Sequence, residues 1–331
     1  MSTLGRVLIT AKSVSDSLAA MAYLREAGCE LTVATTVWPV DEARLIDQST
    51  KMEALVFTME PVSSRLIDAA VNLKVIARPA AGFDTVDMAA ATRRHIAVTV
   101  AAGVNDQSVA DFTLGLMLTA ARGICKAAAG VAQGGWDRVI GTEVWRKTLA
   151  IVGLGHIGKA VAQRARGFDM RVLAVSRRPD AAYAAAHGIE IVSLDQALQD
   201  GDFLSLHAPL NDGTANLIDA AALAKMKQGA YLINTSRGGL VDEQALADAV
   251  ARGHLAGAAV DVLRKQGTQN GSPLIGVPGI IVTPHMASLG REAVERVALS
   301  TVHSLVAVLR GERPASVVNP EIYEAFAKIS S

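Results

Sequence analysis

Three glycines near the middle of the chain have the spacing of a turn that holds the phosphates of a dinucleotide. They lie in the run Gly153-Leu154-Gly155-His156-Ile157-Gly158. This run directly follows a predicted strand, Leu149–Val152, and leads into a predicted helix, Lys159–Gly167, as the motif requires. Gly153 would make the tight turn, Gly155 would let the backbone approach the pyrophosphate, and Gly158 would let helix and strand pack closely. The pattern predicts a dinucleotide site at the helix N-terminus; the alternative is a glycine turn in an unrelated βα unit.

The tip of the next predicted strand, Arg171–Val175, bears on which dinucleotide binds. NAD-binding proteins usually place an Asp or Glu there, roughly 20 residues after the glycines, to bind the ribose 2′-OH. This chain has no carboxylate there but two cations, in Ser176-Arg177-Arg178-Pro179. An arginine can bind a 2′-phosphate, whereas a carboxylate would repel it. We therefore predict contacts from Ser176, Arg177 and Arg178 and a preference for NADP(H), with NAD(H) possible if the arginines are only surface residues.

Polar residues also follow three later predicted strands. The three segments are Asn234-Thr235-Ser236-Arg237-Gly238-Gly239, Gly257-Ala258-Ala259-Val260-Asp261-Val262 and Thr283-Pro284-His285-Met286-Ala287-Ser288. In α/β sheets, ligands bind at the carboxyl ends of parallel strands. Arg237, Asp261 and His285 are therefore candidates for a site at the same sheet edge as the dinucleotide.

Short β-branched runs alternate with Ala- and Leu-rich helical patterns, which predicts βαβ units, parallel sheets and the α/β class. Strands in the first half are predicted at Val7–Thr10, Leu31–Ala34, Ala54–Phe57, Val75–Ala77 and Val98–Val100. Strands in the second half are predicted at Leu149–Val152, Arg171–Val175, Phe203–Leu206, Ala230–Ile233, Gly257–Val260 and Ile280–Thr283. Other helices are predicted at Val14–Ala27, Ser64–Val71, Ser108–Arg122 and Arg291–Arg310, and an irregular segment at Gly130–Lys147.

The chain has 331 residues, which suggests two domains at roughly 100–200 residues each. The last predicted helix lies beyond the dinucleotide unit and could return to the first half. We therefore predict a discontinuous substrate domain, residues 1–103 plus 292–331, and a dinucleotide-binding domain, residues 104–291.

The composition disfavours several other function classes. With 50% hydrophobic and 19% charged residues, the chain can bury a large core and is not expected to be disordered. The formal net charge is zero and there is no basic stripe for nucleic acid. No apolar run is long enough for a transmembrane helix or a signal peptide. Cys29 and Cys125 lack metal-type spacing, so we expect reduced thiols, no metal and a cytoplasmic protein.

Together these motifs resemble the D-isomer-specific 2-hydroxyacid dehydrogenase family, over nearly the whole chain. The other matching blocks are Ala81-Gly82-Phe83-Asp84-Thr85-Val86-Asp87, Gly103-Val104-Asn105, Val109-Ala110-Asp111-Phe112-Thr113, His207-Ala208-Pro209-Leu210 and Val318-Asn319-Pro320. The resemblance implies two Rossmann-like, doubly wound parallel-sheet domains with the active site in the cleft between them. It also implies a homodimer with contacts through about Gly123–Lys147.

The resemblance implies hydride transfer between NAD(P)H and a small 2-keto or 2-hydroxy acid. Arg237 would clamp the substrate carboxylate with a bidentate guanidinium and polarise the carbonyl. His285 would be the general acid in reduction and the base in oxidation, because imidazole titrates near neutral pH. Backbone amides of Ala81 and Gly82 would hold the carboxylate from the other domain, and Asp261 would lie near the nicotinamide end.

Further cofactor contacts follow from the same resemblance, and from His207 we expect backbone contacts rather than chemistry. They are Val109, His156, Ile157, His207, Ala208, Pro209, Thr214, Thr235 and Ser236.

One position departs from the family pattern. The family usually has a Glu, hydrogen-bonded to the catalytic His, five residues after the Asp of the second segment, here Asp261; in this chain that position is Gln266. A neutral amide can orient His285 but cannot stabilise imidazolium by charge, so reduction should fall off at a lower pH. Formate dehydrogenases of this superfamily also pair Gln with His, and formate oxidation needs no proton relay. The alternative is a rearranged loop Arg264–Gly271, in which Gln266 is not the counterpart.

The loop after the third strand bears on which substrate binds. Phosphoglycerate-type members have an arginine in the loop after the third strand, where this chain has Thr58-Met59-Glu60-Pro61. A phosphorylated substrate is therefore disfavoured, although Arg78 could reach the site. The sequence favours an NADPH-preferring reductase of the glyoxylate or hydroxypyruvate type; the alternatives are formate oxidation and a dinucleotide-sensing, corepressor-like binding protein.

Overall fold

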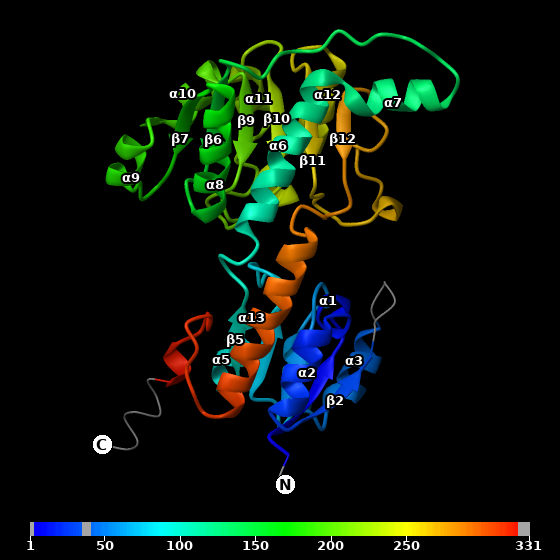
Figure 1. Cartoon of the computed structure of the whole chain (residues 1–331), viewed down its shortest axis with the longest axis vertical. Helices are drawn as coiled ribbons and strands as arrows, with labels where there is room; N and C mark the ends of the chain where they lie inside the picture. Colours follow the sequence, from blue (N-terminus) through cyan, green and yellow to red (C-terminus); the bar gives the residue numbers. More distant parts are fainter. Residues whose placement is uncertain (1–2, 35–40, 324–331) are drawn as a thin grey trace. The chain divides into compact units, whose positions relative to one another are not determined.

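The computed structural model describes residues 3–34 and 41–323, and the chain forms two compact units (Figure 1). One unit comprises Met1–Asn105 and Gly290–Ser331, and the other comprises Asp106–Leu289. The predicted boundaries, after residue 103 and before residue 292, each differ from these by two residues. Each unit is an α/β structure with a parallel sheet, as predicted.

The second unit has a seven-stranded parallel sheet in the order β12-β11-β10-β9-β6-β7-β8. Its strands are β6 (Thr148–Val152), β7 (Arg171–Val175), β8 (Ile189–Ile191), β9 (Phe203–Leu206), β10 (Tyr231–Asn234), β11 (Gly257–Val260) and β12 (Ile280–Val282). Successive strands run outward from β6 in one direction and then, from β9, in the other. The order therefore reverses between β6 and β9, and this is where doubly wound sheets bind ligands.

Helices cover both faces of this sheet because both faces of its strands are apolar. They are α6 (Asp106–Arg122), α8 (His156–Ala165), α9 (Ala181–Ala186), α10 (Leu194–Asp200), α11 (Ala220–Lys225) and α12 (Glu243–Ala251), whereas α7 (Ile124–Ala132) follows α6 and has no buried residue. Leu149 and Ile151 of β6 pack with residues of α6 and α8, and the alternate residues Ala150 and Val152 pack with α10, α11 and α12. Strands buried on both faces are characteristic of parallel sheets.

The first unit has a five-stranded parallel sheet in the order β2-β1-β3-β4-β5. Its strands are β1 (Gly5–Ile9), β2 (Cys29–Val33), β3 (Ala54–Val56), β4 (Val75–Arg78) and β5 (Ala97–Val100). Its helices are α1 (Lys12–Ser15), α2 (Leu18–Glu26), α3 (Glu42–Ser49), α4 (Ser64–Ala69), α5 (Met88–Arg93) and α13 (Arg291–Leu309). Val302 and Leu305 of α13 pack with Val7 of β1 and Val75 of β4, so the last long helix belongs to the first sheet.

Two predicted elements differ from the structure, and one strand was missed. The predicted helix Val14–Ala27 is two helices, α1 and α2, because the Ser17 hydroxyl accepts a hydrogen bond from Ala20 N and caps a new helix. The predicted irregular segment Gly130–Lys147 begins inside α7, and strand β8 was not predicted. Within the described residues no single helix is long and apolar enough to cross a membrane. Helices α6 and α7 reach that length and composition only when taken together, and they are bent by 66° relative to one another.

Candidate active site

The carboxyl edge of the seven-stranded sheet gathers most of the predicted site residues. The parallel register pairs Asn234 with Val260 and Val260 with Val282, so β10, β11 and β12 end together. The loops carrying Arg237, Asp261 and His285 are therefore neighbours. The His207 segment follows β9, the strand next to β10, and the glycine turn follows β6. The arginine segment follows β7, on the other side of β6.

Asp261 anchors the loop that carries His285. Its side chain is fully buried, and its carboxylate accepts hydrogen bonds from Thr283 Oγ1 (2.6 Å), Met286 N (2.9 Å) and Ala287 N (2.8 Å). The Asp261 carbonyl accepts a further bond from His285 N at 2.9 Å. His285 itself has a φ of +54°, which is uncommon outside glycine. Asp261, expected near the cofactor, thus acts inside the protein by shaping the loop of the candidate acid.

The Arg237 loop is held by buried Asn234. The Asn234 carboxamide donates to Arg237 O and accepts from Ser236 N, both at 3.0 Å. Ser236 Oγ donates to Ala208 O at 2.7 Å and so ties the loop to the segment after β9. A Cβ on Gly238 would lie 2.1 Å from the Leu263 carbonyl carbon, so glycine is required where this loop meets the next.

Glu243 at the start of α12 holds the loop containing Gln266. Its nearly buried carboxylate accepts from Arg264 N at 2.5 Å and from Ser272 Oγ at 2.9 Å. Arg264 donates to Val241 O at 2.9 Å. Gln266 Nε2 donates to Leu263 O at 3.3 Å within the same loop. Sequence reasoning missed Glu243, because its partners lie 21 and 29 residues away.

The glycine turn has the features of a phosphate-binding turn. Gly153 has a φ of +102°, and a Cβ on Gly158 would lie 2.1 Å from Gly153 O. A Cβ on Gly155 would meet nothing within 4 Å, so this glycine borders open space. Gly155 precedes α8, and no side chain caps the helix there. The first amides of α8, at His156 and Ile157, can therefore donate to an anion.

The tip of β7 is cationic. Arg177 and Arg178 are exposed, and within the described residues neither makes an ion pair. Gly153 N donates to Val175 O at 2.9 Å, which places the arginine segment beside the glycine turn. The side chain of His156 is 87% exposed and lies 3.8 Å from the Asp106 carboxylate.

The segment after β9 is internally braced. Thr214 Oγ1 donates to Pro209 O at 2.7 Å and accepts from Asn211 N at 2.8 Å. The His207 imidazole shares a hydrogen bond with Ser205 Oγ at 2.8 Å, and burial lowers the pKa of His207 to about 4. His207 is therefore neutral at ordinary pH and is unsuited to be the acid in reduction.

Two threonines connect α6 with the loop after β10. The hydroxyls of Thr113 and Thr235 lie 2.9 Å apart, and Thr113 Oγ1 also donates to Val109 O at 2.7 Å. Thr113 was not among the predicted site residues, because its partner is 122 positions away. Val109 is buried, and Thr235 is fixed by α6.

Ala81 and Gly82 follow β4 in the first unit. Just before them, Arg78 is 5% exposed. Its guanidinium donates to Thr85 Oγ1 at 3.3 Å and lies 5.7 Å from the centre of the Phe57 ring. No cluster of potential metal ligands occurs within the described residues.

Comparisons with known proteins identify the family. The profile of the D-isomer specific 2-hydroxyacid dehydrogenase NAD binding domain matches residues 114–287. The chain belongs to this family. It is 37% identical over 293 residues to a glyoxylate reductase of Korarchaeum cryptofilum, covering 86% of this chain and 88% of that protein.

Two further similarities extend this dehydrogenase assignment. A D-3-phosphoglycerate dehydrogenase of Mycobacterium bovis is 41% identical over 267 residues, which cover 80% of this chain but 50% of that protein. The crystal structure of the TT0316 protein of Thermus thermophilus superposes with a TM-score of 0.88 at 38% identity, covering 95% of this chain and 99% of that one. The chain is thus an NAD(P)-dependent oxidoreductase of the 2-hydroxyacid dehydrogenase type, and its glycine turn fits a nicotinamide dinucleotide.

Substitutions at two glycines of the turn should have different effects, one on cofactor binding and the other on stability. Gly155→Ala should weaken NADPH binding at least tenfold with an unchanged melting temperature, because its Cβ enters the open space for the pyrophosphate. Gly158→Ala should instead lower the melting temperature, because its Cβ overlaps Gly153 O. Fluorescence titration and thermal unfolding measure the two effects. Equal thermal destabilisation by both substitutions would contradict this division.

The buried imidazole predicts a pH effect on stability. The folded-state pKa of His207, about 4, lies below its ordinary value of 6.5, so the unfolded chain binds a proton first as pH falls. The contribution of neutral His207 to stability is complete above pH 6.5 and is lost between there and pH 4. Urea unfolding at several pH values should show that the free energy of unfolding falls less over this range for His207→Asn than for the wild type. Parallel curves would show that burial does not perturb this imidazole.

Proposed function

We propose that the chain is an NADPH-preferring reductase of glyoxylate and hydroxypyruvate. The observation that carries the proposal is the pair of loops after β10 and β12, which present Arg237 and His285 from the same sheet edge as the glycine turn. Each loop is held by a buried polar residue, Asn234 or Asp261, which fixes the backbone from which the two side chains extend. Such preorganisation is what catalytic groups require.

Arg237 binds the substrate in this proposal. A 2-keto acid carries a planar carboxylate next to its carbonyl, and a guanidinium can bind that carboxylate bidentately. The same positive charge polarises the carbonyl and stabilises negative charge developing on its oxygen. Loss of this residue would therefore affect both binding and the chemical step.

His285 supplies the proton. A reduced nicotinamide dinucleotide, when bound, would supply the hydride for the new C–H bond at the carbonyl carbon and would be left oxidised. As the carbonyl π bond breaks, the oxygen takes a proton from the His285 imidazolium, and the product is the 2-hydroxy acid. In oxidation neutral His285 takes the hydroxyl proton back.

Gln266 orients His285 without adding charge. A carboxylate there would favour imidazolium, whereas an amide only accepts or donates a hydrogen bond. Reduction needs the protonated imidazole, so its rate should begin to fall at a lower pH than with a glutamate at this position. The same Gln–His combination keeps formate oxidation as the second candidate activity.

The cofactor preference rests on charge at the end of β7. Exposed Arg177 and Arg178 make no ion pair within the described chain, so they can pair with a 2′-phosphate. Guanidinium groups suit phosphate because they offer several donors in one plane. Ser176 adds a hydroxyl at the same tip.

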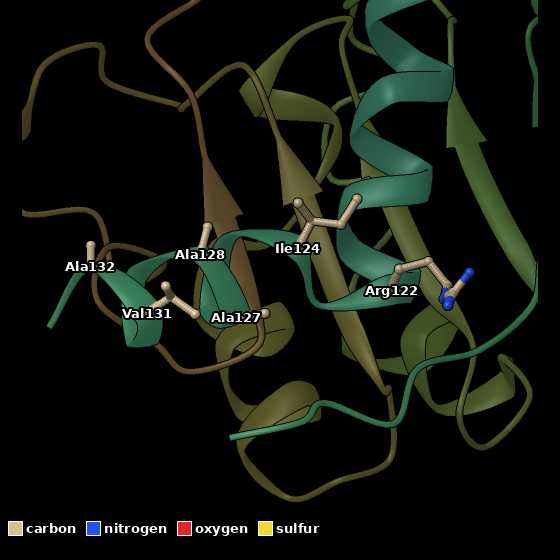
Figure 2. A pocket seen from close by; sticks show the side chains of 6 residues that line it. All are labelled: Arg122, Ile124, Ala127, Ala128, Val131 and Ala132. Carbon is tan, nitrogen blue, oxygen red and sulfur yellow. The ribbon is translucent and has the colours of Figure 1, made fainter. Parts of the chain in front are cut away.

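We also propose that α7 mediates a homodimer. None of its residues is buried, and Ile124 and Val131 are 51% and 50% exposed. Together with Arg122 and three alanines they line a shallow cavity of about 760 Å³ (Figure 2). Trp136 and Ile140 in the following segment are 81% and 98% exposed. A second copy of the chain would cover this surface, as the resemblance implies.

Initial rates with purified protein test the proposed activity. NADPH or NADH would be paired with glyoxylate, hydroxypyruvate or pyruvate between pH 5 and 9. We expect a larger kcat/KM with NADPH, and Arg237→Lys should lower kcat/KM by about a hundredfold or more because the bidentate contact is lost. No cofactor oxidation with any keto acid would exclude a reductase. Formate oxidation, or fluorescence-detected cofactor binding without turnover, would then become the leading assignment.

A single substitution tests the role of Gln266. Gln266→Glu should move the alkaline limb of kcat/KM for reduction upward by roughly one pH unit, because the carboxylate favours imidazolium. Lys265→Gln, next to it, provides a control for a charge change in the same loop. An unchanged limb in Gln266→Glu would mean that Gln266 does not orient His285.

The dimer is tested by light scattering after size-exclusion chromatography. Val131→Asp should convert a dimer to a monomer, because it places a charge on the apolar side of α7. Val71→Asp, at a residue of the first unit that is 66% exposed, should leave the mass unchanged. A monomeric wild type would reject this proposal.

A further inference from the structure

A carboxylate lies close to the arginines that follow β7. Asp180 is four residues after Ser176 in the chain and caps α9 by accepting a hydrogen bond from Tyr183 N at 3.0 Å. A carboxylate at the tip of this strand binds ribose hydroxyls in NAD sites, and an unpaired Asp180, a few residues beyond the tip, would repel a 2′-phosphate. Asp180 could therefore oppose the NADPH preference that the arginines support.

Lys159 occupies the other oxygen of that carboxylate. Its ammonium lies 2.8 Å from Asp180 Oδ2 and 4.1 Å from the centre of the Tyr183 ring. This hydrogen bond from Lys159 lowers the pKa of Asp180 and so favours the ionised carboxylate. Lys159 lies in α8, just after Gly158, and Asp180 precedes α9, so the pair links the phosphate-binding helix with the segment after β7 (Figure 1).

We propose that Lys159 is a cofactor-specificity residue that acts by neutralising Asp180. Tyr183 N and Lys159 each engage one oxygen of Asp180, and the ammonium offsets the negative charge that would otherwise repel a 2′-phosphate. The net charge near a 2′-phosphate is then set by Arg177 and Arg178. This inference rests on the proposed NADPH preference and names a residue that controls it.

A surface pair of this kind has a modest effect. The exposed fractions of the Lys159 and Asp180 side chains are 30% and 51%, so solvent screens the interaction. Removing the ammonium should therefore change affinity for a 2′-phosphate by about three- to fivefold, the upper part of the range for exposed ion pairs. The change should shrink as salt is added.

The test is calorimetric binding of two probes, adenosine 2′,5′-bisphosphate and adenosine 5′-monophosphate, to the full chain. The ratio of their affinities isolates the 2′-phosphate. We expect the wild type to bind the bisphosphate more tightly, and Lys159→Gln to weaken it about three- to fivefold without affecting the monophosphate. Lys159→Arg should retain the wild-type ratio. Asp180→Asn in the Lys159→Gln background should restore the ratio, because asparagine still caps α9 without its charge.

The outcomes separate this inference from the proposed function. If the wild type favours the bisphosphate but Lys159→Gln leaves the ratio unchanged, the preference stands and the role of Lys159 is rejected. If Lys159→Gln weakens the binding of both probes equally, Lys159 has only a structural role, and its role in cofactor specificity is rejected. Failure of Asp180→Asn to restore the ratio would mean that Lys159 does not act through Asp180. Equal binding of both probes by the wild type would overturn the NADPH preference itself, and this inference with it.

Discussion

A carboxylate can stay buried only if donors surround it, and Asp261 meets this condition by shaping the loop after β12. An unpaired buried charge would cost several kcal/mol. The donors come from Thr283, Met286 and Ala287, so the chain must fold back around the carboxylate. This closure leaves His285 with a left-handed backbone conformation, whose cost of about 1 kcal/mol or more is offset by the paired charge. The position of the candidate acid therefore depends on a residue that holds its backbone.

The same device recurs along the sheet edge. Asn234 closes the Arg237 loop, Glu243 closes the loop of Gln266, and Thr214 braces the segment after β9. In each case a buried side chain forms hydrogen bonds with backbone groups of the loop that it holds. Loops that would otherwise sample many conformations are thus limited to a few, and the entropy of ordering them is lost on folding and not when a substrate binds.

Local signals explain what the sequence could predict. Most strands were placed within one or two residues, because buried parallel strands read as short apolar runs, and the glycine turn was identified from its flanking strand and helix. The roles of Asn234, Glu243 and Thr113 could not be predicted, because each depends on a loop geometry or on partners far away in the chain. Asp261 was identified, but its inward orientation follows only from the tertiary structure. Ser17 shows a smaller limit: a cap inside an apolar helical pattern divided one predicted helix into two.

Helix α7 has an implication for folding. A helix of nine residues is too short to be stable alone in water, and this one buries no side chain against its own chain. In the proposed homodimer, a second copy would supply the contacts that stabilise this helix. When a second copy provides that support, forming α7 and forming the dimer become one equilibrium, and dilution acts on this part of the chain as a denaturant would.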